Sequence, residues 1–66
     1  MTREQKIEKA HKLAAQILDK NPDMQPEFAK ACGAYMVLTD QYRMGQVRFS
    51  VWSAGVDGYD KFVAQF

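Results

Sequence analysis

An uninterrupted heptad pattern of apolar positions runs from residue 28 to the end of the chain. One series comprises Phe28, Tyr35, Tyr42, Phe49, Val56 and Val63, and a second lies three places behind it at Ala31, Leu38, Gly45, Trp52, Tyr59 and Phe66. Alternating steps of three and four residues place side chains on one face of a helix. Aromatic side chains are too bulky for the seam of a two-stranded coiled coil, so we interpret the pattern as the shared core of a folded-back helical bundle.

Residues 2–20 form the first predicted helix. Thr2 and Gln5 have the spacing of a capping box, in which each side chain accepts a hydrogen bond from the backbone N–H of the other residue. The helix ends before Pro22, because proline disfavours helical geometry in the residue that precedes it. The apolar face is formed by Ile7, Ala10, Leu13, Ala14, Ile17 and Leu18.

A second helix is predicted over residues 24–44, with Pro26 in the first turn, where its missing N–H is no loss. This helix is apolar on most of its circumference, because Cys32, Met36 and Val37 lie outside the heptad stripe. A helix that is apolar on nearly all sides is normally buried on all sides. We therefore expect a second copy of the chain to cover Cys32, Met36 and Val37 as an oligomer interface.

Gly45 admits more than one interpretation. The heptad phase continues through it, which permits a single helix from the second helix to the end of the chain. Glycine is costly inside a helix, however, and favours a turn at Gly45 with a third helix over residues 49–66. The alternation of Val47, Phe49 and Val51 with polar residues leaves a short strand over residues 47–51 as the second alternative. Gly55 and Gly58 weaken the third helix, so packing must hold it.

The length of 66 residues corresponds to one domain, residues 1–66. A chain of this size buries only about 60% of the surface that its unfolded form exposes, so its stability is marginal without a disulfide, a metal or another subunit. The single cysteine excludes an internal disulfide and the single histidine makes a zinc site implausible. The sequence thus predicts an all-α three-helix bundle that is completed by oligomerisation, with a homodimer as the expected form.

The net charge of +1 gives no field that would attract nucleic acid or an anionic membrane. The charged start of the chain is not typical of a signal peptide, and no apolar segment has the length needed to span a bilayer. A lone thiol also suits a reducing compartment, so we expect a cytoplasmic protein without membrane contact.

Candidate chemistry is scarce. His11 lies at the edge of the first apolar face with no carboxylate placed to orient it, and Cys32 has no partner that would activate it as a nucleophile. Asp57 and Asp60 suggest a calcium loop, but Tyr59 and Lys61 occupy positions that need oxygen ligands. We therefore predict no catalytic residue, no metal site and no cofactor.

The remaining apolar surface indicates a binding function. Arginine beside tyrosine and tryptophan is typical of the energetically dominant residues of protein interfaces. The predicted partner-binding residues are Tyr42, Arg43, Met44, Arg48, Phe49 and Trp52. The sequence thus suggests a small non-enzymatic module that docks on a larger protein and modulates or inhibits it, a role common among accessory proteins of phages and mobile elements.

Nucleic-acid binding is the alternative function. Arg3, Lys6, Lys9 and Lys12 form a basic run in the first helix, and the segment from Arg43 to Trp52 combines arginine with aromatic residues that can stack on bases. Steps of three residues make the four basic side chains spiral around the helix, so they form no continuous basic ridge. Protein binding is therefore the favoured prediction.

Overall fold

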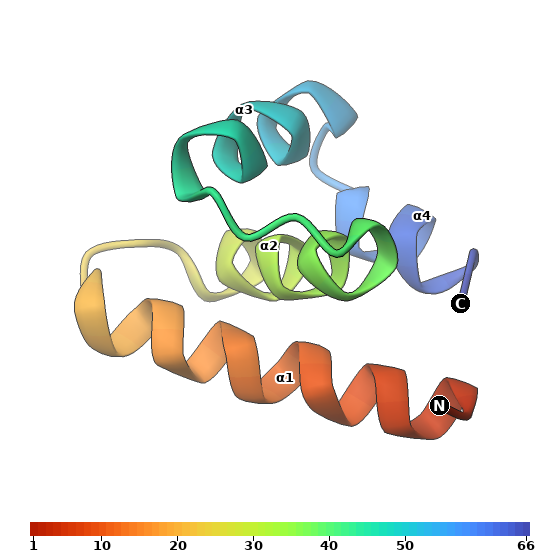
Figure 1. Ribbon diagram of the computed structural model, residues 1–66. Helices are drawn as coiled ribbons and strands as arrows, with labels where there is room; N and C mark the ends of the chain where they lie inside the picture. The colour runs from red at the N-terminus through yellow and green to blue at the C-terminus, as the bar shows by residue number, and fades with distance from the viewer.

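Helix α2 (Pro26–Thr39) lies at the centre of the structure and contacts the other three helices (Figure 1). In this computed structural model, which describes residues 1–66, α1 (Arg3–Lys20) lies on one side of α2 and α3 (Met44–Ala54) on the opposite side. The short helix α4 (Gly58–Val63) packs at one end of α2. The predicted all-α small bundle is confirmed, although it has four helices instead of three.

Helix α1 has the predicted cap and the predicted end at Lys20, and it begins at Arg3, one residue after the predicted start, because Thr2 is the cap. The backbone N–H of Gln5 donates to Oγ1 of Thr2 at 3.1 Å, and that of Thr2 donates to Oε1 of Gln5 at 2.9 Å. At the other end, the side-chain amide of Asn21 donates to the carbonyl oxygen of Ile17 at 3.0 Å. Both ends of α1 are therefore fixed by hydrogen bonds between neighbouring residues. The sequence predicted the start from this cap and the end from Pro22.

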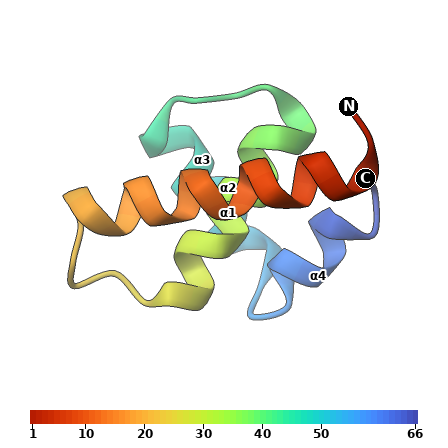
Figure 2. The same cartoon turned by 90° about the horizontal axis from the view of Figure 1, so that it is seen from below.

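The contact between α1 and α2 is built from small residues. Figure 2, seen from the α1 side, shows the two helices crossing steeply. At this crossing Gly33 lies against Ala10, and a Cβ at Gly33 would overlap the carbonyl oxygen of Ala10. Ala10, Ala29 and Ala34 are fully buried. The absence of large side chains here lets the two backbones approach closely, which leaves no room for substitution.

Pro26 lies in the first turn of α2, as predicted, but the helix begins at Pro26 instead of residue 24 and ends at Thr39 instead of residue 44. Asp40 ends it in the left-handed conformation (φ 58°, ψ 29°), with its N–H donating to the carbonyl oxygen of Met36 at 2.8 Å. Aspartate tolerates this conformation better than most residues. The break therefore lies in residues 40–43, ahead of Gly45.

The prediction of a turn at Gly45 was wrong, as were the two alternatives, a continuous helix and a strand over residues 47–51. Gly45 lies in the first turn of α3, which begins at Met44. Val47 and Val51 are one helical turn apart and are both buried, with 0% and 2% of their surface exposed. Their burial on one side of a helix accounts for the pattern that resembled strand alternation.

The predicted helix over residues 49–66 is divided in two by Gly55. This glycine has φ 93° and ψ −174°, a combination that is essentially restricted to glycine. The chain resumes as α4, whose Phe62 is buried and meets Tyr35 of α2 edge to face, with ring centroids 5.4 Å apart. None of the four helices has the length and apolar composition of a bilayer-spanning segment.

Candidate protein-docking surface

Helix α3 carries apolar side chains on two opposite sides. Val47 and Val51 point into the core, whereas Phe49 and Trp52 are 68% and 74% exposed. With about 100° between successive residues, the mean directions of these two pairs lie roughly 150° apart. Val56, just beyond the helix, is fully exposed. We call the exposed stripe of Gly45, Phe49 and Trp52, together with Val56 beyond the end of the helix, the α3 outer face.

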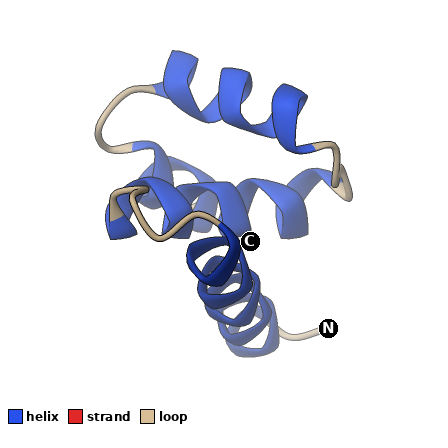
Figure 3. Ribbon diagram, turned by 90° about the vertical axis from the view of Figure 1, so that its left-hand side faces the viewer, coloured by secondary structure: helices blue, strands red, loops and turns tan.

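No part of the chain covers the α3 outer face. Figure 3 shows α3 as the outermost layer of the molecule, with α2 between it and α1. The residues that flank the stripe on the helical wheel are Arg48 on one side and Gln46 and Ser53 on the other. The stripe itself carries no charge. Fully burying a side chain of the size of phenylalanine stabilises a structure by about 1.5–3 kcal/mol, so covering this face is strongly favourable.

The heptad pattern therefore changes its role along the chain. In α2 the members of the pattern are buried or half-buried, namely Phe28, Ala31, Tyr35 and Leu38. At the end of the chain the members are half-buried, namely Tyr59, Val63 and Phe66. Between them, the members from Tyr42 to Val56 are exposed. The interpretation of the whole pattern as a shared core was wrong for α3, because Val47 and Val51 supply the inward face there instead.

A groove between α2 and α3 adjoins the α3 outer face. It has a volume of about 420 Å³ and shares Trp52 and Val56 with that face. Its other lining residues are Gln25, Glu27, Phe28, Ala31, Val51 and Gly55. The exposed apolar surface of α3 therefore continues inward to Phe28, which makes the surface partly concave.

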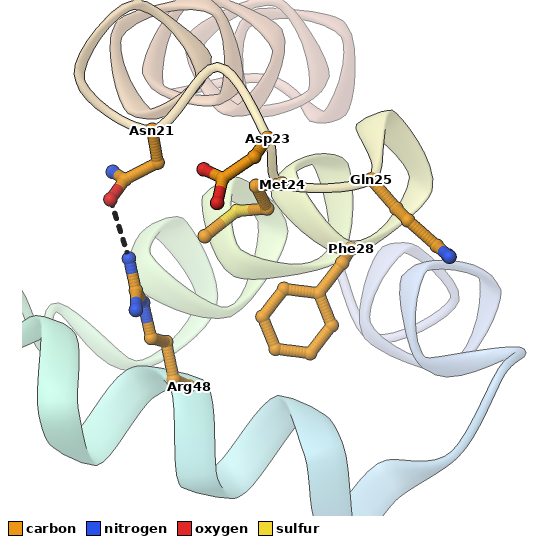
Figure 4. Close-up of a pocket in the computed structure, with 6 residues that line it drawn as sticks. All are labelled: Asn21, Asp23, Met24, Gln25, Phe28 and Arg48. Carbon is orange, nitrogen blue, oxygen red and sulfur yellow. Dashed lines mark hydrogen bonds between the residues drawn. The ribbon is translucent and has the colours of Figure 1, made fainter.

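A second hollow of about 490 Å³ lies on the other side of Phe28, next to the loop between α1 and α2 (Figure 4). Nη2 of Arg48 donates to Oδ1 of Asn21 across this hollow at 2.8 Å. Asp23, Met24 and Gln25 complete the lining. Arg48, predicted to bind a partner, is thus engaged in a contact that joins α3 to the end of α1.

The structure separates the predicted partner-binding residues into two groups. Phe49 and Trp52 lie on the α3 outer face, whereas Tyr42 and Met44 line a hollow of about 250 Å³ on the α1 side. Leu13, Gln16, Ile17, Lys20, Asn21 and Met36 also line that hollow. Arg43 is exposed at the start of α3. These six residues therefore do not form one continuous surface.

The residues predicted as an oligomer interface lie differently. Cys32 is fully buried, Met36 is 4% exposed and Val37 is half-buried, all within a single chain. Helices α1, α3 and α4 surround α2, so this apolar helix is covered without a second chain. Cys32 and Met36, which were predicted to form an oligomer interface, are therefore core residues of the single chain. Burial also raises the pKa of the Cys32 thiol to about 11, opposed by the charge of Arg48.

Two features of the site were missed in the sequence, namely the exposure of Val56 and the groove that contains Phe28. Both residues belong to the heptad pattern, so their periodicity was visible. The signal that distinguishes the exposed part is the second apolar pair, Val47 and Val51, on the opposite side of the same helix. Helix α3 has two apolar sides but packs against the rest of the chain on one side, so the other side stays exposed.

The basic side chains of α1 are interleaved with acidic ones. Nζ of Lys12 lies 3.6 Å from Oε1 of Glu8, and both side chains are well exposed. His11 contacts Tyr59 of α4, with 2.8 Å between its Nε2 and the phenolic oxygen. No group of three His, Cys, Asp or Glu side chains is arranged to hold a metal ion. The α3 outer face is thus the most distinctive surface of the molecule.

Comparison of the chain with protein-family models, with curated proteins and with solved structures gives no match.

Proposed function

We propose that this protein is a non-enzymatic binding module that docks on another protein through the α3 outer face. One observation supports the proposal above all: Phe49 and Trp52 on α3 and Val56 just beyond it are 68%, 74% and 106% exposed. A contiguous apolar patch on a small protein is typical of an interaction site. Tryptophan is also among the residues that contribute most to binding energy at protein interfaces.

The chemistry of the surface favours a protein partner over a nucleic acid. Binding to single-stranded nucleic acid combines aromatic stacking with a groove of positive charge. The α3 outer face carries no charge, and the nearest arginine, Arg48, already donates to Asn21. An uncharged apolar stripe beside a groove fits the apolar side chains of another protein.

Affinity capture from the cells that produce the protein tests this proposal. The tagged chain is compared with a Phe49→Ser/Trp52→Ser double variant and with a Tyr42→Ser control, which removes an exposed aromatic ring from the other surface. We expect the control to retain a bound protein that the double variant loses. Equal capture by all three chains would contradict the proposal.

A titration with random-sequence DNA and RNA tests the alternative. We expect no binding at moderate salt concentration. Tight binding whose affinity falls with a salt slope of several charges would favour the nucleic-acid function instead.

A further inference from the structure

We propose that the hollow between Asp23 and Arg48 binds a free α-amino acid with an apolar side chain. This hollow lies beside the loop between α1 and α2, and Figure 4 shows the six residues that line it. None of them belongs to the α3 outer face, so the site is separate from the proposed docking surface. The support comes from two opposite charges without an ion-pair partner, from an aromatic ring beside them and from the size of the hollow.

The hollow contains one negative and one positive side chain, and neither is neutralised within the chain. None of the three ion pairs of the structure includes Asp23 or Arg48. The two side chains line the same hollow but do not form an ion pair with each other. A ligand that carries both a cation and an anion complements both of them.

Arg48 keeps most of its hydrogen-bonding capacity for such a ligand. A guanidinium has several N–H donors in a planar fork. One of them, on Nη2, donates to Oδ1 of Asn21 at 2.8 Å and holds the group at the wall of the hollow (Figure 4). The other donors have no acceptor in the chain. Because a guanidinium binds a carboxylate through parallel hydrogen bonds, the α-carboxylate of an amino acid fits here.

Asp23 offers the matching group for the other end of the ligand. Its carboxylate accepts no hydrogen bond from the chain. An α-ammonium group is a compact cation that only donates hydrogen bonds, and a carboxylate only accepts them. An amino acid carries its ammonium and its carboxylate on the same carbon atom, so one small molecule supplies both charges within one hollow.

Phe28 and Met24 supply the apolar part of the lining. Both side chains are half-buried, and Figure 4 shows them next to each other between Asp23 and Arg48 on one side and Gln25 on the other. An aromatic ring packs favourably against other apolar groups, and against a second ring in an offset or edge-on arrangement. The side chain of the amino acid therefore packs on Phe28 while its charged groups face Asp23 and Arg48.

The size of the hollow suits a small molecule. Its volume of about 490 Å³ lies within the range of roughly 300–1,000 Å³ that is typical of small-molecule sites. Asp23 and Arg48 are both exposed, so water competes for them and each ion pair contributes little. We therefore expect a dissociation constant on the order of 0.1–1 mM.

Titration with L-phenylalanine, followed by NMR of the isotope-labelled chain, tests the site. We expect saturable shifts of the amide resonances near Asp23, Phe28 and Arg48. N-acetyl-L-phenylalanine lacks the ammonium, L-phenylalanine amide lacks the carboxylate and glycine lacks the apolar side chain. Each should bind at least about tenfold more weakly. The absence of shifts up to about 20 mM L-phenylalanine, or equal binding of any of the three analogues, would overturn the proposal.

Variants of the two charged residues assign their roles. Asp23→Asn should abolish the preference for L-phenylalanine over its N-acetyl form and keep the preference over its amide. Arg48→Gln should have the opposite effect, and Arg48→Lys should keep the preference over the amide because it retains the charge. The matched controls are Asp19→Asn and Arg43→Gln, which remove exposed charges outside the hollow.

Circular dichroism checks that each variant is folded, because Arg48 also joins α3 to Asn21. We expect both control variants to bind L-phenylalanine as the unchanged chain does. Unaltered preferences in Asp23→Asn and Arg48→Gln, or equal weakening by the controls, would overturn the proposal. Neither result bears on protein capture by the α3 outer face, which has other residues and another measurement.

Discussion

Helices α2 and α3 have similarly apolar sequences, but they differ in how the molecule covers them. Helix α2 is enclosed by three other helices, so that even Cys32 and Met36, which lie off its heptad stripe, are buried. Helix α3 is covered on one side alone, and its larger side chains, Phe49 and Trp52, are on the other. The comparison shows that apolar periodicity identifies residues that share a face, whereas the number of neighbouring helices decides which faces are buried.

The largest effect is expected from filling the contact between α1 and α2. Gly33→Leu should destabilise the fold by about 3 kcal/mol or more, since even a Cβ would overlap the carbonyl oxygen of Ala10. Gly45→Ala is the matched control in α3, where the space is open. We expect it to be neutral or slightly stabilising. Urea unfolding followed by circular dichroism measures both, and similar midpoints for the two variants would contradict the comparison.

A second prediction contrasts the two sides of α3. Val51→Ala should lower the free energy of unfolding by about 2 kcal/mol, because it removes buried methyl groups and leaves a cavity. Phe49→Ala removes a larger side chain but should change the stability by less than about 0.5 kcal/mol, because that ring is mostly exposed. Urea unfolding is measured at low micromolar concentration. A larger loss from Phe49→Ala than from Val51→Ala would show that the outer face is packed within the single chain.

A third prediction concerns the enclosure of α2. Burial raises the pKa of the Cys32 thiol from 9.0 to about 11, so the folded chain keeps a proton that the unfolded chain loses between these values. The free energy of unfolding should therefore fall as the pH rises from 9 to 11, by about 1–2 kcal/mol from this group. Cys32→Ala lacks the effect and serves as the control for lysine and tyrosine titration.

The measurement is urea unfolding of both chains at each pH. If the free energy of unfolding depends equally on pH in the two chains, the Cys32 thiol is in contact with solvent. The helices around α2 would then not enclose it completely.

The features that the sequence predicted correctly are those set by neighbouring residues. The cap of α1 depends on Thr2 and Gln5, and the start of α2 depends on Pro26. The end of α2 was not predicted, because Asp40 adopts a left-handed conformation that few residues other than glycine adopt readily. The helix break was therefore assigned to Gly45. Neighbouring residues were sufficient to predict the cap of α1 and the place of Pro26 in the first turn of α2, within two residues of the predicted start, but not the end of α2.

The candidate surface was predicted in part. Phe49 and Trp52 were identified as partner-binding residues, and both are exposed. Tyr42 and Met44 were assigned to the same surface but lie near α1 instead. Their position depends on the direction in which residues 40–43 carry the chain from α2 to α3. That direction is set by packing between distant residues, so a pattern of spacings does not contain it.

The alanine and glycine residues at the crossing of α1 and α2 have a consequence for how this protein can change over time. The core and the side chains packed against it include neither Phe49 nor Trp52, so these two residues are not required to hold the fold together. Mutation can therefore alter the α3 outer face at little cost to folding. The residues that hold the fold together and the residues of the α3 outer face are separate sets, and each set can change while the other is kept.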